Sequence, residues 1–316
     1  NFAPPLPASP SCAREPDHLK PSATLQNQRP GLPLSETVKI VRTVHDLRKI
    51  TRKWRDRGHS IGLVPTMGAL HAGHISLVKL AKKKADRAVV SIFVNPTQFA
   101  ANEDLSRYPR DEAGDLEKLR TADVDLVWAP SVEEMYPLGY STSVRAGSAA
   151  KELEGEFRPG HFDGVATVCA KLFNQVTADI AFFGEKDFQQ LAVLRQMVRD
   201  LNMPLKLIGA PTKRDTDGLA LSSRNAYLSL TERKIAPALY ATISALAEDV
   251  SEGADIATGV ANAKRKVIAA GFKKIDYIEV RDAETLGPAA PESGRSLRVL
   301  AACWLGKTRL IDNVAV

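Results

Sequence analysis

Short apolar runs alternate with longer helical patterns from residue 38 to about residue 211 of this 316-residue chain. The apolar runs lie at residues 61–64, 88–94, 126–129, 180–183 and 205–209. Each run is almost wholly apolar, which is typical of strands that helices cover on both faces of a parallel sheet. The pattern predicts an α/β, Rossmann-like, doubly wound domain, in which ligands bind at the carboxyl ends of the strands.

The pattern changes after Pro211. A polar loop is followed by helical segments at about 231–251 and 254–270, and then by strand-like segments at 275–280, 297–303 and 308–312. Ser229 and Glu232 have the spacing of a capping box, which predicts the start of the first helix. We therefore expect a Rossmann-like domain over residues 36–211 and a smaller α+β C-terminal lid domain over 212–316.

Residues 1–35 form a Pro/Ser-rich N-terminal extension without an apolar period. Such a composition predicts disorder. The segment has neither the apolar core of a secretory signal nor the arginine-rich amphipathic pattern of a transit peptide. We therefore expect this segment to lie outside the folded domains.

The composition restricts the class of protein. The hydrophobic fraction of 44% and the charged fraction of 25% are typical of soluble globular proteins. The three cysteines, Cys12, Cys169 and Cys303, are scattered, which argues against a disulfide framework or a zinc site and suits a reducing cytoplasm. No apolar stretch approaches the roughly 18 residues of a membrane span. We expect a cytoplasmic protein without membrane integration.

The formal net charge of +6 raises the question of nucleic-acid binding. Most of the local excess lies in residues 48–57 and 79–87, where basic residues alternate with apolar ones at helical spacing. No aromatic residues interleave in the second run to stack on bases. Solvated helix faces explain both runs, so we expect no nucleic-acid partner.

Residues 65–74, Pro-Thr-Met-Gly-Ala-Leu-His-Ala-Gly-His, join the first predicted strand to a helical segment. Backbone N–H groups at a helix start attract phosphate, and His71 and His74 would lie on one face of the turn. Small Ala72 and Gly73 leave room for a ligand near the backbone. A bare His-x-Gly-His also fits an ordinary turn with two solvated histidines, and that alternative stays open at this point.

Polar groups follow other predicted strands. Asn95 and Gln98 come after the second strand, and Lys186 and Asp187 come after the fourth. The ammonium of a lysine can neutralise phosphate oxygens, and the carboxylate beside it can accept ribose hydroxyls. The competing interpretation is a surface Glu-Lys-Asp run. Because parallel strands end at one edge of the sheet, we expect these groups to share one crevice.

Four further segments occur in order with the His-x-Gly-His turn, at residues 93–99, 158–164, 183–190 and 217–225. Together they resemble the pantothenate synthetases, a family of the nucleotidyltransferase superfamily that carries the His-x-Gly-His signature. The resemblance extends over about residues 38–316. His-x-Gly-His alone would imply only adenylyl or related nucleotidyl transfer.

The resemblance also implies roles for individual residues. For ATP binding it implies Met67, His71, His74, Gly184, Lys186, Asp187, Ser222, Ser223 and Arg224. Of these, catalysis would involve His71, His74, Lys186 and Arg224. Substrate binding would involve Asn95, Gln98, Gln190, Arg158 and His161.

The resemblance makes Asp115 the candidate ligand for Mg²⁺, with Gly114 at a position that is acidic in some relatives. The alternative for Asp115 is an ordinary aspartate on a helix surface. Asp163 could cap a helix that begins near Gly164 or order a loop at the site, and the structural role is favoured. Ser222, Ser223 and Arg224 would close over the triphosphate as part of a lid.

The implied reaction is the ATP-dependent condensation of pantoate with β-alanine through an enzyme-bound pantoyl adenylate, in a homodimeric ligase. One alternative is another nucleotidyltransferase of the superfamily, but such enzymes attack ATP with a phosphate and would require basic residues at Gln98 and Gln190. The other alternative is a catalytically silent nucleotide-binding protein. The retained His71, His74, Lys186 and Arg224 argue against it.

Overall fold

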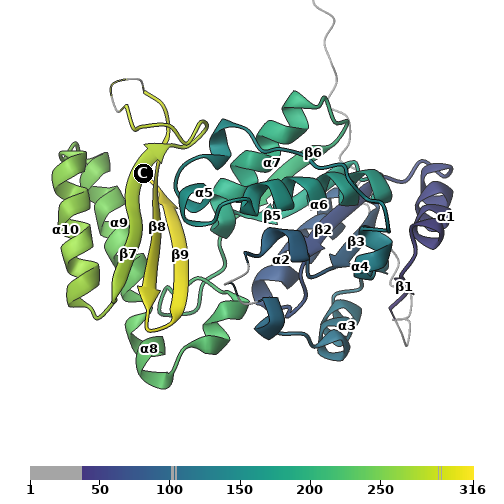
Figure 1. Ribbon diagram of the computed structural model, residues 1–316, viewed down its shortest axis with the longest axis horizontal. Helices are drawn as coiled ribbons and strands as arrows, with labels where there is room; N and C mark the ends of the chain where they lie inside the picture. The colour runs from purple at the N-terminus through teal and green to yellow at the C-terminus, as the bar shows by residue number, and fades with distance from the viewer. Residues whose placement is uncertain (1–37, 101–102, 104, 291, 293) are drawn as a thin grey trace, which may run out of the picture. The chain divides into compact units, whose positions relative to one another are not determined.

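The computed structural model describes residues 38–316 except 101–102, 104, 291 and 293. The predicted disorder of residues 1–35 falls outside the described residues. The first domain contains a six-stranded sheet in the order β1-β4-β3-β2-β5-β6, with every adjacent pair parallel. This confirms the predicted doubly wound architecture (Figure 1).

The strands of this sheet are β1 (Ile40–Val41), β2 (Ile61–Thr66), β3 (Arg87–Ile92), β4 (Leu126–Trp128), β5 (Ile180–Gly184) and β6 (Lys206–Ala210). The predicted runs match β2 to β6 within a few residues. β1 was not predicted, because two residues carry no periodic signal and the strand exists only through its pairing with β4 at Ile40–Val127 and Val41–Trp128.

Helices cover both faces of the sheet. The longer helices are α1 (Val44–Arg55), α2 (Ala72–Lys84), α3 (Glu112–Thr121), α6 (His161–Val176) and α7 (Phe188–Asp200); α4 (Val132–Met135) and α5 (Glu154–Phe157) are single turns. Helices α1, α6 and α7 pack with Leu63 and Val89 on one face, and α2 and α3 pack with Val64 and Val90 on the other. Successive residues of a strand point to opposite faces of the sheet, and helices cover both faces. The strand residues on both faces are therefore apolar.

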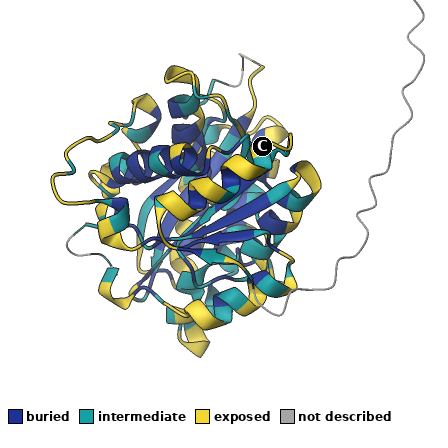
Figure 2. Ribbon diagram, turned by 90° about the vertical axis from the view of Figure 1, so that its right-hand side faces the viewer, coloured by how far each residue is buried: buried dark blue, intermediate teal, exposed yellow. Residues whose placement is uncertain are grey.

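β2 is central to the arrangement because it pairs with β3 on one side and with β5 on the other. The chain runs outward from β2 in one direction and returns to its other side with β5, so β2 and β5 mark the topological switch point. Such a switch opens a crevice at the carboxyl ends of the strands. The central strands β2 and β3 are buried along most of their length (Figure 2).

The C-terminal domain is α+β, as predicted. Its antiparallel sheet consists of β7 (Lys274–Asp282), β8 (Leu297–Leu305) and β9 (Thr308–Ala315), and its helices are α8 (Leu230–Ile235), α9 (Ala238–Ser251) and α10 (Ile256–Ala269). These helices pack on one face of the sheet around Leu239, Ile243 and Ile278. On the other face, Tyr277 and Leu300 pack against Phe162 and Phe188 of the first domain.

One predicted helix is divided in two. The single segment at 231–251 is wrong, since α8 ends before Pro237 and α9 begins after it. Proline has no N–H and its ring clashes with the preceding turn, so a continuous helix is disfavoured there. The capping box at Ser229 and Glu232 is confirmed at the start of α8. In the described part of the chain, no helix is long and apolar enough to cross a membrane.

Candidate active site

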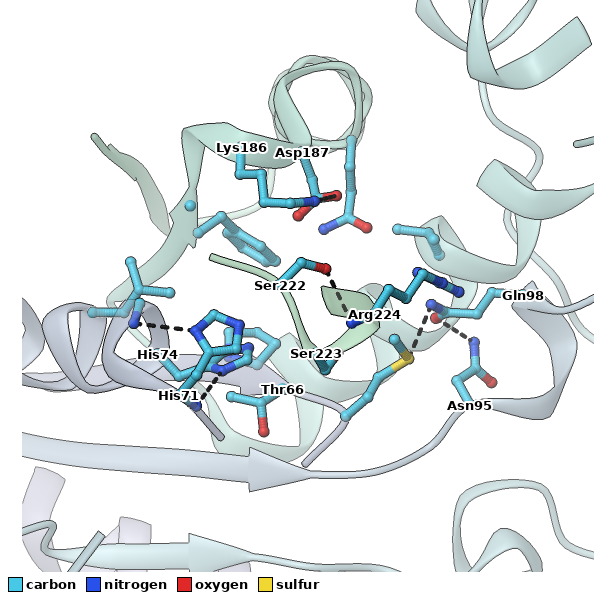
Figure 3. Close-up of a pocket in the computed structure, with 18 of the residues that line it drawn as sticks. Thr66, His71, His74, Asn95, Gln98, Lys186, Asp187, Ser222, Ser223 and Arg224 are labelled. Atoms are coloured by element: carbon cyan, nitrogen blue, oxygen red, sulfur yellow. Dashed lines mark hydrogen bonds and ion pairs between the residues drawn. The ribbon is translucent and has the colours of Figure 1, made fainter. Parts of the chain in front are cut away.

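A pocket of about 220 Å³ opens at the carboxyl ends of β2, β3 and β5, beside the loop that leads into the C-terminal domain (Figure 3). Its walls contain every residue predicted to bind ATP or substrate: Met67, His71, His74, Asn95, Gln98, Arg158, His161, Gly184, Lys186, Asp187, Gln190, Ser222, Ser223 and Arg224. The structure therefore brings together residues from segments far apart in the chain. Asp115 is the one predicted site residue that does not line this pocket.

His71 and His74 form the N-terminal cap of α2. Nδ1 of His71 accepts a hydrogen bond from Gly73 N at 3.1 Å, and Nδ1 of His74 accepts one from His71 N at 3.3 Å. Burial lowers the pKa of His71, and burial together with His71 lowers the pKa of His74 to about 3. Both rings are thus neutral at pH 7. Since each Nδ1 accepts, the proton of each ring is on Nε2, which leaves two N–H donors for a ligand.

The turn before the histidines is held by Asp115. Gly68 and Ala69 have φ values of 79° and 51°, a left-handed conformation that is uncommon for alanine. The carboxylate of Asp115 is 1% exposed and accepts hydrogen bonds from Ala69 N at 2.8 Å and Leu70 N at 2.7 Å. Asp115 therefore stabilises the turn that presents His71.

This geometry does not support the prediction that Asp115 binds Mg²⁺ from within the pocket. Both carboxylate oxygens already accept backbone hydrogen bonds, and Nζ of Lys118 lies 3.7 Å from Oδ1. No group of three or more His, Cys, Asp or Glu side chains among the described residues is arranged to hold a metal ion. The sequence could not reveal this, because Asp115 and Ala69 are 46 positions apart.

Lys186 and Asp187 lie in the 3-10 turn η4 (Glu185–Asp187), directly after β5. Nζ of Lys186 is 3.5 Å from Oδ1 of Asp187. The loss of solvent around the Asp187 carboxyl group in the pocket acts to raise its pKa, but the charges of Lys186 and Arg224 hold that pKa below the usual range. The pocket thus contains a carboxylate beside two cations. The carboxylate suits ribose hydroxyls, and the cations suit phosphate oxygens.

Ser222, Ser223 and Arg224 begin the 3-10 segment η5 (Ser223–Tyr227) on the opposite side of the pocket. Oγ of Ser222 accepts a hydrogen bond from Arg224 N at 3.3 Å, and Oγ of Ser223 lies 3.3 Å from the hydroxyl of Tyr108. Tyr108 also lines the pocket and was not predicted to do so. Nothing in the sequence relates it to Ser223, which follows 115 positions later.

The loop before η5 is a short hairpin, with Arg214 bridged to Ala220 and Gly218 in a left-handed turn. Arg214 makes a bidentate ion pair with Asp312 of β9, and Arg233 of α8 pairs with Asp215 and Asp217. Gly218 N donates to Asp215 O at 3.0 Å, which closes the turn at the tip of the hairpin. These ion pairs attach the hairpin before Ser222 to β9 and α8 of the C-terminal domain.

Asn95 and Gln98 act as a pair. Asn95 is fully buried; its Nδ2 donates to Oε1 of Gln98 at 3.1 Å and to Gly164 O at 3.2 Å, and its Oδ1 accepts from the hydroxyl of Tyr136 at 2.8 Å. Nε2 of Gln98 donates to Sδ of Met67 at 3.2 Å. The carboxamide of Asn95 is thus occupied by protein groups, and it orients Gln98, whose side chain borders the pocket.

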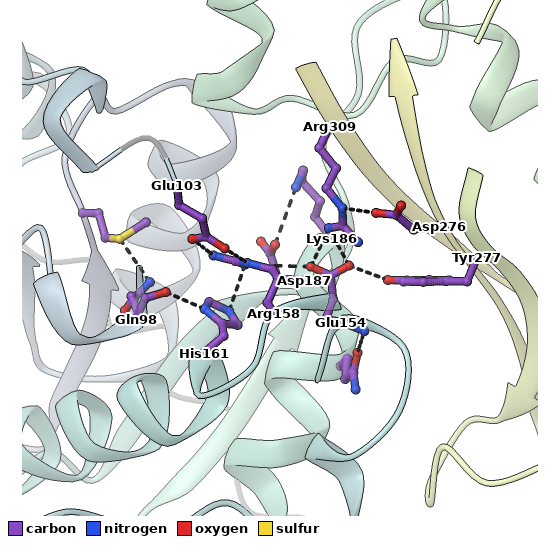
Figure 4. A network of polar contacts seen from close by, with 12 residues as sticks. Gln98, Glu103, Glu154, Arg158, His161, Lys186, Asp187, Asp276, Tyr277 and Arg309 are labelled. Carbon is purple, nitrogen blue, oxygen red and sulfur yellow. Dashed lines mark hydrogen bonds and ion pairs between the residues drawn. The ribbon is translucent and has the colours of Figure 1, made fainter. Parts of the chain in front are cut away.

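Arg158 and His161 belong to a polar network at the pocket wall (Figure 4). The guanidinium of Arg158 makes a bidentate pair with Glu103, at 2.7 and 2.8 Å, and Nη1 donates to Nε2 of His161 at 3.0 Å. Burial and the nearby charge of Arg158 lower the pKa of His161 to about 4. Neutral His161 therefore carries its proton on Nδ1, which donates to Gln98 O at 2.9 Å.

Two acidic residues of this network were not predicted. Glu103 pairs with Arg158, and buried Glu154 pairs with Arg309 of β9 at 2.7 Å. An isolated glutamate in a polar stretch gives no signal of either partner. The predicted helix cap at Asp163 is wrong, because α6 begins at His161, directly after Gly160. The carboxylate of Asp163 instead accepts a hydrogen bond from Ala146 N at 2.8 Å.

The chain has close relatives among known proteins. Residues 39–315 match the family model described as pantoate-beta-alanine ligase. The pantothenate synthetase of Paramagnetospirillum magneticum is 53% identical over 283 residues, which cover 90% of this chain and 99% of that protein. The pantothenate synthetase of Caulobacter vibrioides is 52% identical, with 88% and 98% covered.

Solved structures agree with these sequence matches. A crystal structure of pantothenate synthetase from Thermus thermophilus superposes with a TM-score of 0.82 at 44% identity, over 88% of this chain and 99% of that one. Pantoate-beta-alanine ligase from Francisella tularensis, complexed with beta-gamma ATP and beta-alanine, gives a TM-score of 0.74 at 36% identity, with 88% and 97% covered. With its fold and most of its length matched, this chain belongs to the pantoate-beta-alanine ligase family.

Proposed function

We propose that this enzyme condenses pantoate with β-alanine to give pantothenate, with conversion of ATP to AMP and pyrophosphate. The observation that carries the proposal is the content of one pocket. It contains two neutral histidine donors, the cations Lys186 and Arg224, and the amide of Gln98. The histidine donors and the two cations suit a polyphosphate, and the amide suits a hydroxy acid. The names of the relatives agree with this substrate pair.

The first half-reaction forms pantoyl adenylate. A carboxylate oxygen of pantoate attacks the α-phosphorus of ATP, and the bond from that phosphorus to the β-phosphate oxygen breaks to release pyrophosphate. Negative charge grows on the phosphate oxygens during this step. We assign its stabilisation to Nε2–H of His71 and His74 and to Lys186, with Ser222 and Arg224 on the departing pyrophosphate.

The second half-reaction forms the amide bond. The amine of β-alanine attacks the acyl carbon, the bond from that carbon to the AMP oxygen breaks, and the nitrogen loses a proton as pantothenate forms. No protein nucleophile is required, so the contribution of the protein is alignment of the reactants and exclusion of water. In this scheme Gln98 and Gln190 bind pantoate, with Asn95, Arg158 and His161 fixing that wall of the pocket.

We further propose Mg·ATP as the form of ATP that enters the pocket. Asp115 is 1% exposed and does not line the pocket, so its carboxylate is not placed to bind a metal ion on the phosphates. Magnesium usually keeps phosphate and water ligands and needs few protein carboxylates. No step of the reaction is assigned to a metal site of the protein.

We also propose that the enzyme is a homodimer and that it is cytoplasmic. The dimer rests on the family resemblance, and the compartment rests on the few, scattered cysteines. Sedimentation equilibrium of the purified chain tests the dimer directly, since a single species with the mass of one chain would contradict it.

The reaction is tested with purified enzyme, pantoate and Mg·ATP, following pyrophosphate and AMP with and without β-alanine. We expect pyrophosphate stoichiometric with enzyme when β-alanine is absent, and continuous release of AMP when it is present. ATP binding without any product would instead favour the non-catalytic nucleotide-binding alternative. Product formation with a phosphate-bearing acceptor in place of pantoate would favour another nucleotidyltransferase.

A further inference from the structure

The turn that carries Lys186 is held by a residue from the other domain. Asn313, in β9, is 3% exposed, and its Nδ2 donates to the carbonyl oxygens of Glu185 at 2.9 Å and Lys186 at 2.8 Å. We propose that Asn313 is a positioning residue for Lys186 in the phosphate-transfer step. The inference rests on the proposed function, in which Lys186 acts on ATP.

The orientation of the Asn313 amide is fixed by a second side chain. Nε of Arg298 donates to Oδ1 of Asn313 at 2.6 Å, and Nη2 of Arg298 lies 3.2 Å from the carboxylate of Glu185. The guanidinium of Arg298 also lies over the ring of Phe188, 3.8 Å from its centroid. Since arginine can only donate, the oxygen of the amide must face Arg298 and both of its N–H groups remain for the two carbonyls.

The two carbonyls flank a single Cα. The Glu185 carbonyl belongs to the peptide unit before the Cα of Lys186, and the Lys186 carbonyl belongs to the peptide unit after it. Each peptide unit is planar, so fixing both oxygens fixes the two backbone dihedral angles of Lys186. That backbone sets the direction of the Cα–Cβ bond of Lys186. The side chain that starts from this bond is 18% exposed and lines the pocket beside Asp187 (Figure 3).

Other contacts already hold the two domains together. Phe162 and Phe188 of the first domain pack against Tyr277 and Leu300 of the C-terminal sheet, and Glu154 pairs with Arg309. The bonds of Asn313 are directed instead at the backbone on either side of Lys186. A change at Asn313 should therefore alter the placement of Lys186 while the domain contact remains.

The first experiment compares Asn313→Asp with Gln175→Glu. Both exchange a buried amide for a carboxylate of the same shape. Gln175 is 7% exposed, bonds to Trp128 and lies outside the pocket walls, so it serves as the control.

The readout is the single-turnover rate of pyrophosphate release with pantoate and Mg·ATP, without β-alanine. We expect Asn313→Asp to slow this rate by about 10- to 100-fold, because a displacement near 1 Å can cost that much. Gln175→Glu should retain the wild-type rate, and equal rates for Asn313→Asp and Gln175→Glu would overturn the proposal.

A double-mutant cycle separates positioning from a merely structural role. If Asn313 acts through Lys186, Asn313→Ala slows the wild-type enzyme but causes no further loss in Lys186→Ala. Multiplicative losses in the two backgrounds would overturn the proposal. Asn313→Ala introduces no buried charge, so it also serves if Asn313→Asp does not fold.

Hydrogen exchange gives a readout independent of activity. Amide exchange at residues 185–188 should rise in Asn313→Ala, while exchange in α10 stays at the wild-type level; unchanged exchange at residues 185–188 would contradict the proposal. Failure of the proposed function is distinguishable from failure of this inference, because in the former case the wild-type enzyme itself releases no pyrophosphate from pantoate and Mg·ATP.

Discussion

At the scale of single residues, the site depends on side chains whose protonation is fixed by their hydrogen bonds. His71, His74 and His161 are all neutral, but for two different purposes. The first two accept backbone N–H groups at Nδ1 and keep Nε2–H for a ligand, whereas His161 accepts from Arg158 and donates to Gln98 O. The same residue type thus leaves N–H donors for a ligand in one place and fixes the pocket wall in another.

Lys186→Ala tests the principal cation of the site. Removing one charge-stabilising donor from a preorganised site typically costs about 10²–10³ in rate, and we expect that loss in pyrophosphate formation at saturating substrates. Thermal unfolding should be close to wild type. Lys79→Ala, at an exposed position of α2, is the matched control. Near-wild-type turnover of Lys186→Ala would rule out the assigned role.

His161 should make the stability of the protein depend on pH. Its pKa is about 4 in the folded protein against 6.5 for an ordinary histidine, so between these values the unfolded chain binds more protons. Its contribution to stability is therefore complete above about pH 6.5 and is lost as the pH falls toward 4. At pH 5 the loss is roughly 2 kcal/mol.

Urea unfolding at pH 7 and pH 5 measures this effect. The decrease in unfolding free energy between the two pH values should be smaller in His161→Gln than in the wild type by roughly that amount. An identical pH dependence in the two proteins would mean that His161 titrates normally in the folded state.

At the scale of elements, the close approach of α6 to the 3-10 segment η1 (Pro96–Gln98) determines the shape of the pocket wall at Gln98. A Cβ atom added at Gly164 would lie 2.4 Å from Thr97 O and 2.8 Å from the Cα of Gln98. Glycine at this position also lets Asn95 reach the Gly164 carbonyl. The absence of a side chain on one helix thus permits the placement of Gln98.

Gly164→Ala should therefore damage both stability and pantoate binding. Overpacking typically costs about 1–3 kcal/mol, which urea unfolding would detect. Because η1 must move, we also expect a higher KM for pantoate and a smaller change in the KM for ATP. Equal changes in both KM values would show that the contact does not act locally on Gln98.

At the scale of the whole molecule, a buried ion pair connects the C-terminal sheet to the network around Arg158 (Figure 4). Arg309 bonds to Glu154 at 2.8 Å and to Asp276 at 2.7 Å, and the hydroxyl of Tyr277 donates to Glu154 at 2.8 Å. Glu154 in turn lies 3.8 Å from Arg158. The desolvated charges compensate one another only while every partner is present.

Arg309→Met should reduce the free energy of unfolding by about 3–5 kcal/mol, because it leaves carboxylates buried beside one cation fewer. Adding Glu154→Gln should restore part of this loss, since the uncompensated charge is removed. Urea unfolding of the two single variants and the double variant measures the coupling. Additive losses would show that the two side chains stabilise the protein independently.

The sequence by itself determined the architecture and most of the site. Apolar runs of strand length, helical periodicity and the order of five motifs were enough to predict the doubly wound sheet, the α+β domain and the residues that now line one pocket. These features are local, because each is set by residues close together in the chain. The signal that divides the helix expected at 231–251 is also local, since it is the single residue Pro237.

The tertiary structure alone decided the partners of the polar groups. Asp115 holds the turn at Ala69, Asn95 orients Gln98 with the help of Tyr136, and Asn313 reaches the backbone of Lys186. Asp115 and Ala69, Tyr136 and Asn95, and Asn313 and Lys186 are each more than 40 positions apart, so no spacing in the sequence relates them. Buried polar groups must be satisfied, but folding decides which groups meet, and therefore which side chains face the ligand and which hold others in place.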